Sequence, residues 1–226
     1  MKNLLLKPDM LEAFKRGDKT QTRRLLIPQP IASVYEIKEH SELAGYWIPY
    51  AIDRRMVNNN VGNRKDDCGY YPRFHVGEVV FLGEPHYRYG HWRNTGTWTK
   101  AGRKEWEFVP LTDEVRYKEN CPSGVCRPEL RLSGWYKRTP LFMPAKDART
   151  HARITSIGCG RLWDMTEADC KAEGIEGKVI YGKLRYLVLF DEPVSAFAFL
   201  WDKINPRYPW SSNPWVFNYG IERVEL

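Results

Sequence analysis

The sequence has few cysteines and no long apolar run. Its five cysteines are an odd number without a regular framework, which argues against the disulfide scaffold of a small secreted domain and fits reduced thiols. No stretch approaches the roughly 20 apolar residues that a membrane-spanning helix needs. The run Leu4–Leu6 is too short for the core of a signal peptide. We therefore expect a cytoplasmic protein with no membrane partner.

Internal repeats and low-complexity tracts are also lacking. The 226 residues are 42% hydrophobic and 28% charged, a composition typical of a folded globular protein rather than a disordered one. A chain of this length buries a sizeable core, in one large domain or two small ones. We expect one elaborated domain over residues 1–226.

Positive charge is plentiful but unevenly placed along the chain. The net charge is +7, of which residues 1–28 carry +4 and residues 85–140 carry +5, whereas the last 76 residues carry about −1. Basic segments mixed with Trp and Tyr suit a single-stranded nucleic acid, whose phosphates pair with the cations and whose bases stack on the rings. A solvated basic surface explains the charge equally well.

Hydrophobic periodicity predicts short helices that alternate with strands. The helices are expected over 8–16, 166–174 and 194–205, and the strands over 20–27, 74–82, 151–159, 186–190 and 214–226. Residues 29–75 have no clear period and are expected to be irregular, and 85–140 should form hairpins and long loops. Several strands with few short helices favour a mixed sheet or small barrel over a parallel βαβ array.

Regular spacing also predicts which side chains face the core. Thr166 and Asp169 have the spacing of a helix capping box. The expected core residues follow helical or alternating patterns: Met10, Leu11, Phe14, Ala152, Ile154, Ile157, Phe197, Leu200, Trp201, Ile204, Trp215, Phe217, Tyr219 and Ile221.

The segment Lys19–Arg24 carries the densest group of candidate functional residues. Its sequence, Lys-Thr-Gln-Thr-Arg-Arg, packs three cations and two hydroxyls at the mouth of a predicted strand. In a strand, Thr20, Thr22 and Arg24 share one face, and Gln21 and Arg23 share the other. A hydroxyl beside a guanidinium can hold a carbonyl or phosphate oxygen. An exposed edge strand without a site is the other interpretation.

These residues belong to a longer pattern through which the chain resembles the ASCH family of PUA-like proteins, in particular a prophage-encoded branch. The chain departs from the pattern at Gly83, where the family has Arg before Glu84, and at Glu78, where it usually has Asp. The matching segments are Gly17–Arg24, Pro28–Pro30, Gly77–Glu78, Pro140–Pro144, Ala148–Arg149, Leu162–Asp169, Ala172–Ile175, Leu200–Asp202 and Asn213–Val216. Residues 31–70 and 85–138 have no counterpart in this pattern.

The resemblance implies an α+β fold: a PUA-like small mixed β-barrel with flanking short helices and large loop insertions at about 31–70 and 85–138. Relatives include amidohydrolases that deacetylate N4-acetylcytidine without a cofactor. Their catalytic positions fall on Lys19 as base, Thr22 as nucleophile and Glu173 as proton relay. The residues expected to contact the substrate, a nucleoside or single-stranded nucleic acid, are Thr20, Arg23, Arg24 and Glu84.

Other functions remain open at this point. The same residues could serve a non-catalytic reader of RNA or modified DNA that uses the basic insertion. Asp66 and Asp67 could bind a divalent ion in a ribonuclease, although a solvated loop explains them better. Cys121 and Cys126, with Cys68, Cys159 or one of the histidines, have a spacing compatible with zinc, but no second paired motif accompanies them.

Overall fold

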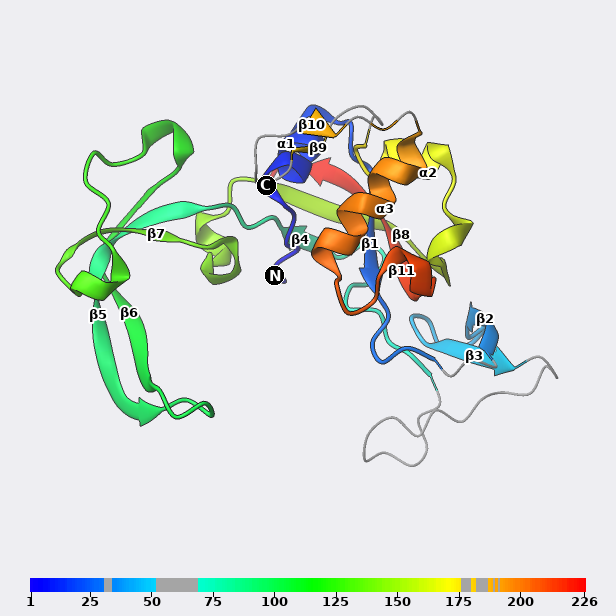
Figure 1. Ribbon diagram of the computed structural model, residues 1–226, viewed down its shortest axis with the longest axis horizontal. Helices are drawn as coiled ribbons and strands as arrows, with labels where there is room; N and C mark the ends of the chain where they lie inside the picture. The colour runs from blue at the N-terminus through cyan, green and yellow to red at the C-terminus, as the bar shows by residue number, and fades with distance from the viewer. Residues whose placement is uncertain (31–33, 52–68, 176–179, 182–186, 189, 191) are drawn as a thin grey trace. The chain divides into compact units, whose positions relative to one another are not determined.

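The computed structural model divides the chain into two compact units (Figure 1). The smaller unit consists of Met1–Pro8 and Val80–His151, and the larger of Asp9–Val79 and Ala152–Leu226. Each unit contains its own β-sheet. The described residues are 1–30, 34–51, 69–175, 180–181, 187–188, 190 and 192–226.

Three short helices and mostly antiparallel strands make the described part of the chain an α+β protein, which confirms the predicted class. The helices are α1 (Pro8–Arg16), α2 (Glu167–Ala172) and α3 (Pro193–Ile204). The strands are β1 (Gln21–Leu25), β2 (Val34–Glu39), β3 (Trp47–Ala51), β4 (Val79–Phe81), β5 (His86–Trp98), β6 (Lys104–Arg116), β7 (Gly134–Arg138), β8 (His151–Arg161), β9 (Ile180–Tyr181), β10 (Leu187–Val188) and β11 (Trp215–Val224). The described strands form no closed barrel, so the PUA-like barrel stays a prediction.

The sheet of the larger unit includes β1, β11 and β8 as neighbours in that order. Antiparallel pairing of β1 with β11 places Gln21 opposite Gly220 and Leu25 opposite Val216. The predicted alternation of β11 is confirmed, because the side chains of Trp215, Phe217, Tyr219 and Ile221 are all buried. Val216, on the opposite face, is buried as well, since both faces of this strand are covered.

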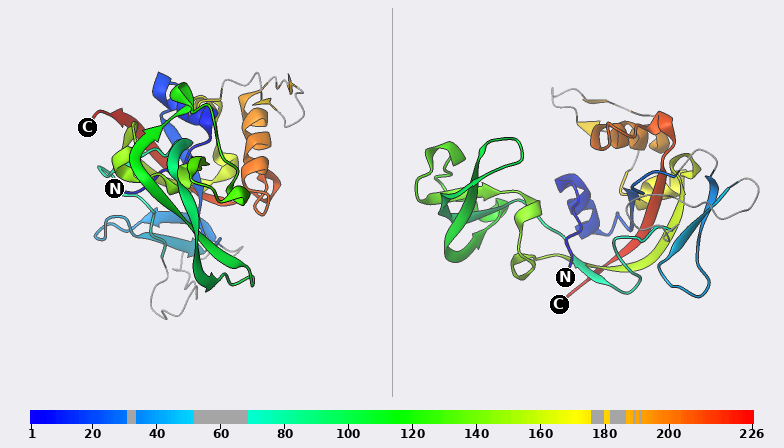
Figure 2. Two further views of the ribbon diagram at one scale, coloured as in Figure 1. Left: turned by 90° about the vertical axis from the view of Figure 1, so that its left-hand side faces the viewer. Right: turned by 90° about the horizontal axis from the view of Figure 1, so that it is seen from below.

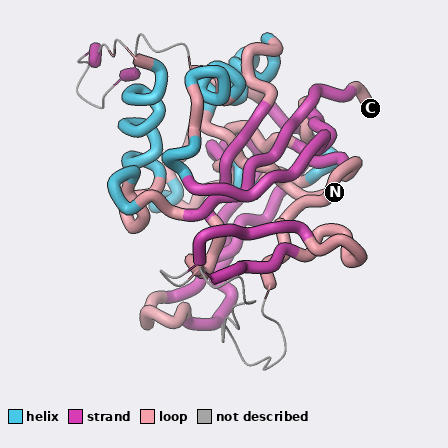
Figure 3. The backbone as a smooth tube through the Cα atoms, turned by 90° about the vertical axis from the view of Figure 1, so that its right-hand side faces the viewer, coloured by secondary structure: helices cyan, strands magenta, loops and turns pink. Residues whose placement is uncertain are grey.

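Helix α3 packs its apolar stripe into a core shared with α2 and β11. Figure 3 shows the backbone of the helices in cyan and of the strands in magenta. Phe197, Leu200 and Trp201 are buried as predicted, whereas Ile204 is 47% exposed because it is the last residue of the helix. With 12 residues, α3 is well short of the roughly 20 needed to cross a bilayer. Within the described ranges, no helix is long and apolar enough to span a membrane.

The chain turns sharply between α1 and β1. The helix buries Leu11 and Phe14, as its periodicity predicts, and ends at the predicted stop, Gly17. Gly17 has a φ of +90°, a conformation that costs glycine little. The backbone N–H groups of Asp18 and Lys19 both donate to the carbonyl oxygen of Ala13. This closure fixes the direction in which the chain enters β1.

The segment 29–75 contains more regular structure than its composition predicts. Strands β2 and β3 pair as an antiparallel hairpin, with Ile37 opposite Pro49 and Glu39 opposite Trp47. The side chains of Val34 and Ile37 are buried. The expectation of an irregular segment is therefore wrong for these two strands. Residues 52–68 lie outside the described part of the chain.

Strand β8 runs from His151 to Arg161, two residues longer than expected. Ala152 and Ile154 are fully buried as predicted, and Ile157 is half-buried. The predicted turn before β4 is confirmed: Gly77 has a φ of +83° and donates its N–H to the carbonyl of Ile154 at 2.8 Å. The strand that follows this turn, β4, is shorter than expected.

In the smaller unit, residues expected to form hairpins and long loops build a three-stranded antiparallel sheet of order β6-β5-β7. Its long hairpin pairs Tyr87 with Arg116 at one end and Trp98 with Lys104 at the other. Strand β7 pairs only with the first residues of β5, up to Gly90. The two long strands therefore continue beyond β7 as a two-stranded ribbon (Figure 2).

Replacement of a core leucine tests the packing around α3. Leu162 is fully buried in this core, so Leu162→Ala should lower the free energy of unfolding by about 2–5 kcal/mol through lost burial and a residual cavity. Leu43→Ala, at a position that is 56% exposed in the same unit, should change it by less than about 0.5 kcal/mol. Urea unfolding of the two variants measures both values, and equal costs would contradict this description of the core.

Candidate functional site

Lys19 and Glu173 meet where two helices end. They face each other in an isolated antiparallel β-bridge, and the N–H of Thr20 donates to the carbonyl of Ala172 at 2.8 Å. Gly174 follows with a φ of +81°, and a Cβ at this position would lie 3.2 Å from the Cβ of Lys19. A glycine at this position therefore serves both the end of α2 and the close approach of the two segments.

The side chains of this bridge form a buried ion pair. The Nζ of Lys19 lies 2.6 Å from Oε2 of Glu173 and donates to the carbonyl oxygen of the same residue at 2.9 Å. The two residues are only 2% and 5% exposed. Arg23 approaches the other carboxylate oxygen of Glu173 at 3.4 Å. The close ion pair and the additional hydrogen bonds offset the free-energy cost of removing the two charges from water.

Opposing effects set the protonation of Lys19. Burial, the largest effect, lowers the pKa of Lys19 below its usual 10.5 because the charged ammonium loses its hydration. The charge and hydrogen bond of Glu173 act in the opposite direction. Arg24 and Arg23 add to the lowering, since neighbouring cations disfavour a third positive charge. The result is a lysine whose ammonium releases its proton more readily than an exposed lysine does.

One face of β1 is directed at α2. Arg23 lies 3.3 Å from a carboxylate oxygen of Asp169, and the amide of Gln21 lies 3.4 Å from the other oxygen. The alternation predicted for these two strand residues is thereby confirmed. The charge cluster, which we define as Lys19, Arg23, Arg24, Asp169 and Glu173, therefore contains three cations and two carboxylates.

Thr22 and Arg24 occupy the alternate positions of β1. Thr22 is 2% exposed and pairs across the sheet with Tyr219. Arg24 is half-buried, and loss of hydration lowers the pKa of its guanidinium, which the charge of Glu173 partly offsets. A buried hydroxyl and a poorly hydrated cation thus lie two residues apart on the same strand.

Two other predicted site residues have different surroundings. Thr20 is exposed, and its backbone carbonyl accepts from the N–H of Ile221 at 2.8 Å. Glu84 belongs to the smaller unit and is buried, where Arg149 donates to both of its carboxylate oxygens at 3.0 and 2.7 Å. These paired hydrogen bonds raise the pKa of the guanidinium of Arg149. The structure thus gives Glu84 a structural partner.

Asp169 is the member of the charge cluster that the sequence did not reveal as part of a site. The predicted capping box is confirmed, since the Thr166 hydroxyl accepts from the N–H of Asp169 and the Asp169 carboxylate accepts from the N–H of Thr166. Its carboxylate also faces Arg23. The available signal was the spacing of Asp169 and Glu173, because residues four apart lie on one side of a helical turn.

The metal-binding alternatives find no support among the described residues. In this part of the chain, no three His, Cys, Asp or Glu side chains gather as metal ligands. Cys121, Cys126 and Cys159 are free thiols. Cys68, Asp66 and Asp67 lie outside the described residues.

Comparison with known proteins returns no relative. No protein-family model, no curated protein and no solved structure matches the chain. The ASCH resemblance therefore depends on the quoted motifs alone and stays a prediction. The charge cluster has to be interpreted from its own geometry.

Removing the carboxylate of the ion pair tests its structural role. Glu173→Gln leaves the ammonium of Lys19 buried without its counter-ion and should lower the free energy of unfolding by about 3–5 kcal/mol. Glu167→Gln, an exposed position at the start of the same helix, should cost at most about 1 kcal/mol. Urea unfolding compares the two, and a small cost at Glu173 would show that the pair contributes little.

The lowered pKa of Lys19 predicts a pH dependence. Between that lowered pKa and 10.5, the unfolded chain binds more protons at this residue than the folded chain does, so its contribution to stability rises with pH. The difference in unfolding free energy between the wild type and Lys19→Met should therefore increase as pH rises through the alkaline range. Lys171→Met, an exposed lysine of α2, controls for loss of a lysine. If the stability difference between the wild type and Lys19→Met instead fell as pH rises, the pKa of Lys19 would be raised rather than lowered in the folded protein.

Proposed function

We propose that the chain is a cytoplasmic PUA-like protein of the ASCH type that binds a nucleoside or nucleic acid and hydrolyses the amide of an N4-acylated cytosine. The observation that supports this proposal best is the buried Lys19–Glu173 ion pair, with the buried Thr22 three residues after Lys19 in the sequence. Amide hydrolysis by a threonine needs a base that is neutral for part of the time, and burial moves Lys19 in that direction.

In the proposed reaction, the neutral Nζ of Lys19 takes the proton of the Thr22 hydroxyl while Oγ1 attacks the acyl carbonyl carbon. Collapse of the tetrahedral intermediate breaks the bond between this carbon and N4, and the leaving N4 takes a proton to become the amino group of cytosine. Water then hydrolyses the acyl-threonine ester, which releases the carboxylic acid and restores the Thr22 hydroxyl. Atoms and charges balance without a cofactor.

The remaining members of the charge cluster have defined tasks in this scheme. Glu173 receives the proton from Lys19 through their hydrogen bond and passes it to the leaving nitrogen. Arg24 stabilises the negative oxygen of the intermediate, because a poorly hydrated guanidinium interacts more strongly with an anion than one in water. Arg23 holds Glu173 and Asp169 in place.

A non-catalytic reader of modified bases is the second candidate, and the same ion pair supports it. Glu173 lies 2.6 Å from Nζ of Lys19, and this carboxylate favours the protonated lysine. A lysine that stays protonated donates hydrogen bonds to an acyl or ring carbonyl but cannot activate Thr22. The two candidates therefore differ in turnover and not in the residues that bind.

Paired substitutions at Thr22 test the proposed nucleophile. Thr22→Val keeps the shape of this buried side chain without the hydroxyl and should lower kcat on N4-acetylcytidine by at least about 100-fold. Thr22→Ser retains the hydroxyl and should keep measurable activity. Release of acetate, followed with and without EDTA, gives both rates.

Three results would contradict the hydrolase. Full activity of Thr22→Val would remove the proposed nucleophile, and loss of activity in EDTA would require a metal. Absence of turnover in a wild-type protein that still binds the nucleoside would favour the reader.

A further inference from the structure

The net positive charge of the chain lies in its smaller unit. This unit carries 15 basic and 8 acidic side chains, a net charge of +7, whereas the larger unit carries 20 of each. A unit with this excess of cations attracts a polyanion, and the larger unit has no such excess. The charge therefore points to a binding surface apart from the charge cluster of the larger unit.

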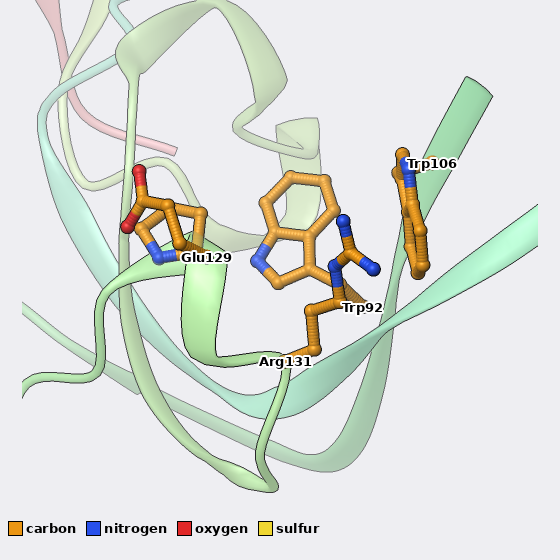
Figure 4. Close-up of a pocket in the computed structure, with 5 residues that line it drawn as sticks. Trp92, Trp106, Glu129 and Arg131 are labelled. Carbon is orange, nitrogen blue, oxygen red and sulfur yellow. The ribbon is translucent and has the colours of Figure 1, made fainter. Parts of the chain in front are cut away.

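The sheet of the smaller unit bears a pocket of about 250 Å³ (Figure 4). It is lined by Trp92 from β5, Trp106 from β6, and Pro128, Glu129 and Arg131 from the connection between β6 and β7. Pockets for drug-sized ligands measure roughly 300–1,000 Å³, so this one suits a smaller group, such as a single ring system. Aromatic and charged side chains dominate its lining.

One wall of the pocket is a stacked cation. The guanidinium carbon of Arg131 lies 3.6 Å from the centre of the Trp106 ring, and the side chain is exposed. Arg131 has a φ of +53°, an uncommon conformation for a residue other than glycine, asparagine or aspartate. Such conformations are concentrated where a side chain is held for binding. Figure 4 shows the guanidinium between the two tryptophan rings.

The facing wall has an unsatisfied donor. The ring of Trp92 is held by edge contacts to Phe108 and Tyr136, with Arg138 4.9 Å from its centre. Its Nε1 is buried and has no hydrogen-bond partner among the described residues. An indole N–H can only donate, and burying it without an acceptor costs free energy. The contacts to Phe108 and Tyr136 fix the ring of Trp92 as a wall of the pocket.

We propose that this pocket binds one unpaired base of a single-stranded nucleic acid. The base stacks against the ring of Trp92 and the guanidinium of Arg131, whose other face lies on Trp106, and Glu129 accepts from an amino group. The phosphates are held by exposed basic side chains of the same unit, namely Arg103, Lys104, Arg127 and Lys137.

The chemistry of the pocket favours a base over a methylated ammonium group, the other ligand that binds between aromatic rings. A cationic ligand needs the faces of the rings, and here the cation of Arg131 already lies on Trp106. The positive charge of a methylated ammonium in this pocket would be repelled by the guanidinium of Arg131. A neutral base stacks on a guanidinium as well as on a ring, so Arg131 strengthens its binding.

The proposal is tested with a short, end-labelled single-stranded RNA whose binding is followed by fluorescence anisotropy. Trp106→Ala should weaken binding about 5- to 150-fold, which corresponds to the roughly 1–3 kcal/mol measured for stacking one base. Arg131→Gln, at an exposed side chain, should also weaken it and reduce the salt dependence. Trp163→Ala, an exposed tryptophan of the larger unit, is the matched control and should bind as the wild type does.

The same RNA without bases separates stacking from charge. Trp106→Ala should bind this abasic strand as tightly as the wild type does, because only phosphate contacts remain. Equal binding of normal RNA by Trp106→Ala and the wild type would overturn the proposal, as would quenching of tryptophan fluorescence by a trimethyl-lysine peptide without RNA binding. The proposal is independent of the proposed hydrolase, since Trp106→Ala should deacetylate free N4-acetylcytidine at the wild-type rate.

Discussion

The buried ion pair between Lys19 and Glu173 is the interaction on which the larger unit depends. The two residues are 154 positions apart in the sequence, and their pairing brings the start of β1 against the end of α2. Burying either charge alone would be unfavourable, because the free energy lost with its hydration exceeds the stabilisation that uncharged neighbours provide. Gly17 and Gly174 make the approach possible through backbone conformations that other residues adopt at a cost. The pair therefore couples the helix ends to the sheet.

The same interaction carries the proposed chemistry. Burial lowers the pKa of Lys19, and Glu173 partly restores it, so the balance of the two effects decides whether the lysine acts as a base or as a fixed cation. Arg23 and Arg24 shift that balance towards the neutral amine. A hydrolase and a reader of bases thus differ by a modest change in electrostatics within one set of side chains.

Local patterns predicted most elements of the larger unit. Helix α1 with its stop at Gly17, the capping box of Thr166 and Asp169, the buried stripe of α3 and the alternation of β11 are all as expected, because each depends on residues near in sequence. The hairpin of β2 and β3 was missed, since Pro49 interrupts the strand signal and no alternation is visible. The sheet of the smaller unit was expected only as hairpins and loops, because Gly and Pro are frequent there.

By itself, the sequence determined the α+β class, the residues of β1 that share a face, and the uneven placement of positive charge. Each of these follows from composition or from the two-residue and 3.6-residue periods of strands and helices. Only the tertiary structure decided that Lys19 is buried against Glu173, that Asp169 both caps α2 and faces Arg23, and that Trp92, Trp106 and Arg131 line one pocket. The physical reason is that burial and ion pairing arise from contacts between segments distant in sequence, which no local pattern encodes.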